Sequence, residues 1–176
     1  IIMRGDILDK LGLREQAKNM KTWADYENIM AAFKESGLPG YATGGGAGFG
    51  MISNNGCIYQ GENISDSYIF DPLGDVYFSL ATDQNGKAMN QVAMEETQNQ
   101  FKMFRKWMDA GYMYPDSAYD STGAKELFNQ GVLFSVFAAS EYGVETSWRA
   151  SSGYDVECYL VGESPLNTSN AQKFGL

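Results

Sequence analysis

The run Val132–Ala138 (VLFSVFA) constrains the fold of this chain more than any other segment. Every residue in it except Ser135 is apolar, and a short, nearly continuous apolar run is typical of a β-strand that is buried on both faces. A strand of that kind needs helices on both sides of its sheet. Helical patterns precede and follow the run, so we expect an α/β domain in which helices flank a sheet.

Residues 22–36 carry the signals of an amphipathic helix. Thr22 is a good N-cap, and Asp25 follows three residues later, as in a capping box. Gly37 and Pro39 then end the helix. The helical spacing of its apolar residues predicts a buried face made of Trp23, Tyr26, Ile29, Met30 and Phe33.

A longer helix is predicted from Met94 to Ala110, with Gly111 as its natural end. Acidic residues lie in its first turn and basic residues near its end, as the helix dipole favours. Its aromatic Trp107, like other aromatics on helices, is most simply a core residue. We expect it to pack against the sheet through an inner stripe of Met94, Thr97, Phe101, Phe104 and Met108.

The remaining predicted elements are shorter. Helices are expected at residues 6–11, 122–130 and 141–150. Thr122 would cap the second of these, with Leu127 and Phe128 facing inward and Gly131 ending it. Further strands are expected at residues 1–3, 76–80, near Met89 and 154–161, with a turn at Asn85-Gly86.

Composition excludes several classes of function. The 176 residues are enough for one domain, and with 44% hydrophobic and 20% charged residues the chain is globular. Its net charge of −9 disfavours nucleic-acid binding, since the phosphate backbone would be repelled. No apolar run approaches the ~20 residues of a membrane-spanning helix.

The chain contains no histidine. This excludes Ser-His-Asp and Cys-His catalytic groups and the HExxH zinc site. Cys57 and Cys158 show no CxxC spacing, so a zinc cluster is excluded as well, while the two thiols could pair or stay free. We therefore expect no catalytic residue, no metal and no cofactor.

A glycine-rich segment, Gly44–Gly50 (GGGAGFG), invites a nucleotide-binding interpretation. No register of it gives a complete GxGxxG, and no GK[ST] follows, so phosphate binding is disfavoured. A flexible turn is the simplest interpretation. A ligand-binding loop is the more informative one, because glycines let a ligand approach the backbone closely and Phe49 adds an aromatic surface.

Carboxylates and loop aromatics supply the other candidates. Four aspartates, in Asp71-Pro72-Leu73-Gly74, at Asp75, in Pro115-Asp116 and at Asp120, match no calcium-binding loop. The two that flank prolines are typical of turns, so structural roles are expected. Glu141 and Tyr142 follow the apolar run directly. For Glu141, an exposed residue in the first turn of a helix and a ligand contact are equally good interpretations.

Three segments, in order, resemble a known family. They are MRGDILDKLGL at residues 3–13, KTWADY at residues 21–26, and the long helix followed by PD and ELFNQG between residues 101 and 131. Their order and spacing over about residues 3–138 resemble extracellular solute-binding proteins of ABC importers. The likeness is to the oligosaccharide-binding group, which includes lipoproteins of the aldouronate-transporter type.

The resemblance implies that residues 1–160 form one lobe of a periplasmic-binding-protein-like (type II) fold, and that residues 161–176 begin the return toward the hinge or tail. A second lobe, absent from this chain, would close the ligand cleft, and ABC permease subunits would receive the ligand. The full protein would be extracytoplasmic, at the cell surface or in the periplasm, and anchored by a lipid. Since the chain starts at Ile1 without a signal peptide, we expect it to be a piece of that longer protein.

By position, the resemblance assigns ligand contacts to two loops that follow extended runs. These loops should meet at one open edge of the sheet, and their candidate residues are Gly45, Gly46, Phe49, Ser140, Glu141 and Tyr142. Glu141 stands near where the family often has a tryptophan, which leaves the ligand open. An oligosaccharide receptor is the first hypothesis; a carboxylate-dependent glycosidase fragment and a receptor for peptides or other polar solutes are the alternatives.

Overall fold

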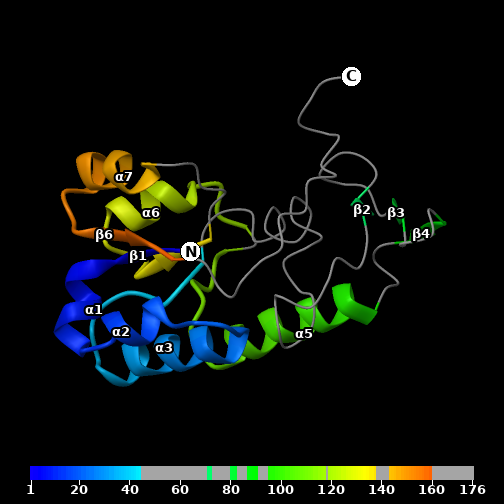
Figure 1. Cartoon of the computed structure of the whole chain (residues 1–176), viewed down its shortest axis with the longest axis horizontal. Coiled ribbons are helices and arrows are strands. Elements are labelled where there is room, and N and C mark those ends of the chain that lie inside the picture. Colours follow the sequence, from blue (N-terminus) through cyan, green and yellow to red (C-terminus); the bar gives the residue numbers. More distant parts are fainter. Residues whose placement is uncertain are drawn as a thin grey trace.

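A computed structural model describes residues 1–44, 71–72, 80–82, 87–90, 95–117, 119–137 and 143–159 (Figure 1). The helices are α1 (Gly5–Leu11), α2 (Arg14–Lys18), α3 (Trp23–Glu35), α5 (Glu95–Asp109), α6 (Ala124–Asn129) and α7 (Val144–Ser152). The strands are β1 (Ile2–Arg4), β2 (Asp71–Pro72), β3 (Leu80–Thr82), β4 (Ala88–Asn90), β5 (Ser135–Val136) and β6 (Val156–Cys158).

The central sheet has the order β5-β1-β6, with both pairs antiparallel. Ile2 is opposite Val136 on one side and Cys158 on the other, so β1 is the middle strand. The apolar run does supply a buried strand, although β5 is shorter than the expected Val132–Ala138. Its ladder with β1 spans only two residues, but burial extends over residues 133–136. Ala138 lies outside the described residues.

Helices cover both faces of this sheet, which confirms the α/β expectation. Successive β-residues point to opposite faces: Met3 joins a core cluster with residues of α1, α2, α3 and α5, whereas Ile2 joins a cluster with residues of α6 and α7. Figure 1 shows the same layers, with α6 and α7 above the sheet and α1, α2 and α3 below it.

Helix α3 matches its prediction closely. The Thr22 hydroxyl accepts a hydrogen bond from the Asp25 N–H at 3.1 Å, and the Asp25 carboxylate accepts one from the Thr22 N–H at 2.9 Å, which completes the capping box. All five residues predicted for the inner face are buried: Trp23, Tyr26, Ile29, Met30 and Phe33. The spacing of the apolar residues was enough to predict the buried side chains of α3, because one face of this helix packs on the core along its whole length.

Helix α5 is present as predicted, but its main described contacts differ from the expectation. Phe104 and Trp107 are buried, and Phe101 is half-buried. Trp107 lies against Trp23 of α3, and Lys106 forms an ion pair with Glu27 of the same helix. The helix therefore packs largely on α3 rather than on the sheet alone. The side chains of Met94 and Thr97 lie outside the described residues.

Three predicted boundaries need correction. Gly123, not Thr122, is the N-cap of α6, because its carbonyl accepts the N–H groups of Glu126 and Leu127. The N–H of Thr122 is donated instead to the Asp120 carboxylate, at 2.8 Å. Helix α7 begins three residues later than the predicted Glu141, after Gly143 in the left-handed conformation, and ends at Ser152 rather than Ala150. The short helix α2 was not predicted.

A second small sheet has the antiparallel order β2-β3-β4. Strand β4 confirms the extended piece near Met89, while the Asn85-Gly86 turn and most of the predicted strand at 76–80 lie outside the described residues. Asp71-Pro72 was expected in a turn but forms β2. Proline is found in strands of this kind, because β2 is an edge strand and pairs on one side only among the described residues.

Candidate ligand-binding edge

Three extended runs lie side by side and point the same way, at residues 41–43, 112–114 and 133–135. Tyr41 and Leu133 form a parallel bridge, as do Thr43 and Met113. Backbone hydrogen bonds join the runs: the Phe134 N–H donates to the Tyr41 carbonyl at 2.9 Å and the Thr43 N–H to the Tyr112 carbonyl at 3.1 Å. Because the runs are parallel, all three end at one edge, which we call the carboxyl edge.

The candidate residues proposed from the sequence come after two of these runs. Gly45, Gly46, Phe49, Ser140, Glu141 and Tyr142 all lie outside the described residues. Their described neighbours are Gly44, which follows the run at 41–43, and Phe137, which lies two residues after the run at 133–135. Those two runs are hydrogen-bonded neighbours, through the Ser135 N–H and the Ala42 carbonyl at 3.0 Å.

A buried chain of hydroxyl groups joins α3 to the parallel runs. The Ser135 hydroxyl donates to the Ala42 carbonyl at 2.6 Å, which leaves its oxygen to accept a hydrogen bond from the Tyr26 hydroxyl at 2.5 Å. Burial raises the pKa of Tyr26 to about 12, so this phenol stays protonated and keeps donating. The chain fixes the two runs relative to each other just before they reach the carboxyl edge.

Aromatic side chains pack around Phe137, two residues after the run at 133–135. The Phe137 ring stacks on Trp107, with centroids 6.3 Å apart and planes at 7°. It also lies 5.5 Å from Trp23 and 5.3 Å from Tyr26, centroid to centroid. Phe137 is half-buried, so this cluster reaches from the core to the surface at the carboxyl edge. Its rings fix where the chain leaves the sheet.

Pro115-Asp116 was predicted as a turn but not as part of this edge. The structure describes this turn at residues 115–117 and 119–120, and we call it the 115–120 turn. It follows the third parallel run, and it lies against Gly44: a Cβ atom on Gly44, where φ is +135°, would be 2.7 Å from the Ser117 Oγ and 2.8 Å from the Tyr114 Cβ. The close approach therefore requires glycine at position 44. Only the parallel pairing of distant runs reveals this neighbour, although Pro115-Asp116 after a tyrosine-rich run was a usable signal.

Hydrogen bonds join the described residues of the turn. The Tyr114 hydroxyl donates to Asp120 Oδ2 at 3.0 Å, and the Ser117 hydroxyl donates to the Tyr114 carbonyl at 2.6 Å. The N–H groups of Tyr119 and Asp120 both donate to the Asp116 carbonyl. The Thr122 N–H, together with the Tyr114 hydroxyl, keeps the pKa of Asp120 below its usual value, and the hydrogen bond to Asp120 raises the pKa of Tyr114.

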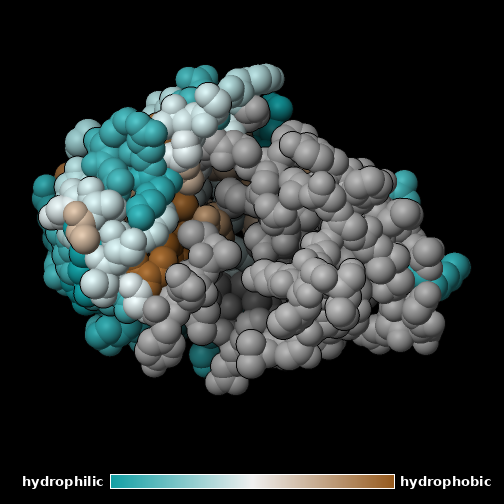
Figure 2. Space-filling view, turned by 90° about the horizontal axis from the view of Figure 1, so that it is seen from above, coloured by the Kyte–Doolittle hydropathy of each residue, from teal (hydrophilic) through white to brown (hydrophobic). Residues whose placement is uncertain are grey.

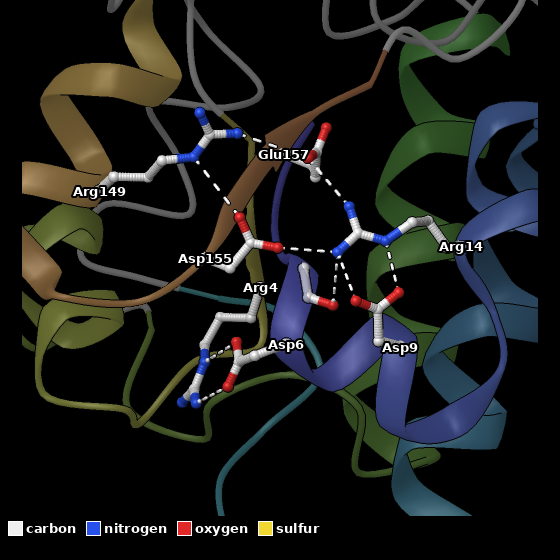
Figure 3. A network of polar contacts seen from close by, with 8 residues as sticks. Arg4, Asp6, Asp9, Arg14, Arg149, Asp155 and Glu157 are labelled. Atoms are coloured by element: carbon white, nitrogen blue, oxygen red, sulfur yellow. Dashed lines mark hydrogen bonds and ion pairs between the residues drawn. The ribbon is translucent and has the colours of Figure 1, made fainter.

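The opposite edge of the sheet carries a network of charges centred on Arg14 (Figure 3). The Arg14 guanidinium contacts Asp9 at 2.6 Å, Asp155 at 2.7 Å and Glu157 at 2.9 Å. The hydrogen bond from Arg14 lowers the pKa of Asp9, and ion pairing with these carboxylates raises the pKa of Arg14 further above neutrality. Arg149 adds contacts to Asp155 and Glu157. Each of these carboxylates is paired with an arginine, and the network joins α1, α2, α7 and β6.

Within the described segments, no group of three or more cysteine, aspartate or glutamate side chains is placed to hold a metal ion. None of the helices found there combines the length and the apolar character needed to cross a bilayer.

Comparison with known proteins gives a fold relationship. No family model matches the chain, and no curated protein matches it. Two crystal structures of the N-glycan transport solute-binding protein NgtS from Streptococcus pneumoniae do match. The structure in complex with Man1GlcNAc gives a TM-score of 0.61 and the other gives 0.59, each at 17% identity and over 89% of this chain.

The match covers 32% and 31% of the two NgtS chains, so this chain spans about a third of the length of its structural neighbours. At this identity the likeness is one of fold. The chain thus has an α/β fold similar to a part of a solute-binding protein.

Proposed function

We propose that this chain is one lobe of a type II solute-binding protein that supplies an ABC importer, and that it binds an oligosaccharide at its carboxyl edge. The fold likeness to NgtS, which was crystallised with Man1GlcNAc, supports the class of protein and the class of ligand. The proposed location of the ligand site rests on one observation, the parallel pairing of the runs at 41–43 and 133–135.

The ligand contacts in this proposal are the loops that continue those runs: Gly45, Gly46 and Phe49 in the first, and Ser140, Glu141 and Tyr142 in the second. Sugar rings present an apolar C–H face and a hydroxyl edge. Phe49 and Tyr142 would pack on the former, while Glu141, Ser140 and the glycine backbone would bind the latter. A second lobe would close over the ligand, permease subunits would receive it, and a lipid would anchor the protein outside the cytoplasm.

A thermal-shift measurement on the full-length protein tests the ligand class. The probes are Man1GlcNAc, xylotriose carrying glucuronic acid, and trialanine. A ligand that binds only the folded protein raises the Tm, by an amount that grows with its concentration above the Kd. We expect a rise with one of the sugars and none with trialanine. A rise with trialanine alone would instead favour a peptide receptor on the same fold.

Chromatography of the same sugars after prolonged incubation separates a receptor from a glycosidase fragment. A receptor returns the sugar intact. Hydrolysis that is lost on replacing a single carboxylate would contradict the proposal.

A further inference from the structure

Tyr119 stands out among the described residues, because 91% of its side chain is exposed and no other large hydrophobic side chain there is exposed. Single exposed aromatics are common on protein surfaces and by themselves mean little. Two features distinguish this one: hydrogen bonds join the described residues of its turn, and the turn lies at the carboxyl edge.

Backbone hydrogen bonds hold the residue that carries the Tyr119 ring. The Tyr119 N–H donates to the Asp116 carbonyl at 2.9 Å, and the next N–H, of Asp120, donates to the same oxygen at 2.8 Å. The Tyr114 hydroxyl then ties Asp120 back to the end of the parallel run. A ring that is presented from a fixed backbone loses less entropy on binding than one on a loose loop.

The place of the turn is set by Gly44. Ser117 and Tyr114 lie so close to Gly44 that a Cβ atom there would overlap both of them. The turn thus lies beside the first residue that leaves the run at 41–43. Figure 1 marks the same edge by the label N, since β1 starts where β5 ends. In Figure 2 the layer formed by α6 and α7 is mostly teal and white, and a brown, hydrophobic area lies on its side toward the centre of the view.

The turn also offers a carboxylate. Asp116 is exposed, and within the described part of the chain its side chain makes no ion pair or hydrogen bond. Asp120 differs, because its two oxygens already accept hydrogen bonds from the Thr122 N–H and the Tyr114 hydroxyl. An aromatic face and a free carboxylate on one turn match the two surfaces of a sugar: the ring packs on C–H groups and the carboxylate accepts from hydroxyls.

We infer that the 115–120 turn is a third ligand-binding segment, in which Tyr119 stacks on a pyranose ring and Asp116 accepts a hydrogen bond from a sugar hydroxyl. This inference rests on the proposed function and adds a binding segment to it. It assigns ligand recognition to all three runs that end at the carboxyl edge, rather than to two of them.

Calorimetric titration of the full-length protein with Man1GlcNAc, and separately with xylotriose carrying glucuronic acid, tests this. We expect Tyr119→Ala to weaken binding of the sugar that the wild type binds by about tenfold or more, as for a central aromatic contact. Tyr119→Phe should bind within about twofold of wild type, because the stacking face is kept. Asp116→Asn should weaken binding severalfold, since it removes a charged acceptor.

Asp109→Asn is the matched control. Asp109 is also exposed and acidic, but it ends α5, before the run at 112–114 begins, and pairs with Arg105. It should leave the Kd unchanged. The Tm of every variant should match wild type, because the side chains are exposed. If the wild type binds a sugar and Tyr119→Ala binds it equally well, this inference fails and the proposed function stands. If the wild type binds neither sugar, both fail.

Discussion

The two ends of the central sheet are built from different chemistry. One end carries arginines and carboxylates that satisfy one another around Arg14. The carboxyl edge carries hydroxyls and aromatic rings, and it includes a buried Tyr159 hydroxyl with no hydrogen-bond partner in the described residues. At the first end the charges are largely balanced by one another, whereas aromatic faces and unpaired polar groups are available for other contacts.

The end of the sheet with the highest density of charge is thus not the end at which we propose the ligand site. The end with the most titratable groups is the one that is most completely satisfied, and Gly5 shows how tightly it is assembled. A Cβ atom at Gly5 would lie 2.3 Å from the Asp155 carboxylate. The proposed site is at the other end, where hydrogen bonds between the runs at 41–43 and 133–135 fix their positions.

The largest effect is expected from Trp107→Ala, at the carboxyl edge. Trp107 is completely buried and contacts Trp23, Tyr26, Phe104 and Phe137. Removing it leaves a cavity and should lower the free energy of unfolding by about 3–5 kcal/mol. Urea denaturation measures this. A loss below about 1 kcal/mol would mean that the aromatic cluster does not hold this edge.

The second largest loss in the free energy of unfolding is expected at the end of the sheet that carries the Arg14 network. Arg14→Ala leaves Asp9, Asp155 and Glu157 close together without their shared cation, and should cost about 2 kcal/mol after allowance for solvent screening. Arg105→Ala removes a single exposed pair with Asp109 and should lower the free energy of unfolding much less than Arg14→Ala does. Equal losses in the two variants would show that the network adds nothing beyond an ordinary surface pair.

Two Tyr→Phe variants measure how much the buried tyrosine hydroxyls at the carboxyl edge contribute to the free energy of unfolding. Tyr26→Phe removes the buried hydrogen bond to Ser135 and should cost about 1 kcal/mol. Tyr159→Phe removes a hydroxyl that is buried without a partner in the described residues, so it should be neutral or stabilising by up to about 1 kcal/mol. Thermal and urea unfolding give both values. A cost at Tyr159 equal to that at Tyr26 would reveal a partner for its hydroxyl.

The smallest effect is a pH dependence. Hydrogen bonds from the Lys21 and Thr22 N–H groups lower the pKa of Asp25 in the folded protein below its unfolded value near 3.8. Its contribution is therefore complete above about pH 4 and is lost as the pH falls through the lower folded value. Solvent screening keeps it under about 1 kcal/mol. Asp25→Asn should flatten the acid limb of the stability curve slightly, and an unchanged limb would contradict this.

Sequence reasoning succeeded where local signals and burial agree. The helix that Thr22 and Asp25 cap was predicted with its whole inner face, because capping and a single apolar stripe are both local properties. It failed at Gly123, where the cap is a backbone carbonyl rather than a side chain. It also failed at Asp71-Pro72, because only pairing with β3 makes that dipeptide an edge strand.

The sequence by itself determined that this chain is an α/β domain with a buried apolar strand and with helices that have one apolar face. Those features follow from periodicity, which is set within a few residues. The tertiary structure decided the neighbours: it joined Tyr41 to Leu133 and Thr43 to Met113, placed the 115–120 turn against Gly44, and gathered three carboxylates around Arg14. Except for Asp9, which is five positions from Arg14, these pairings join residues about 70 to 145 positions apart. The packing of the whole core, rather than any local pattern, selects them.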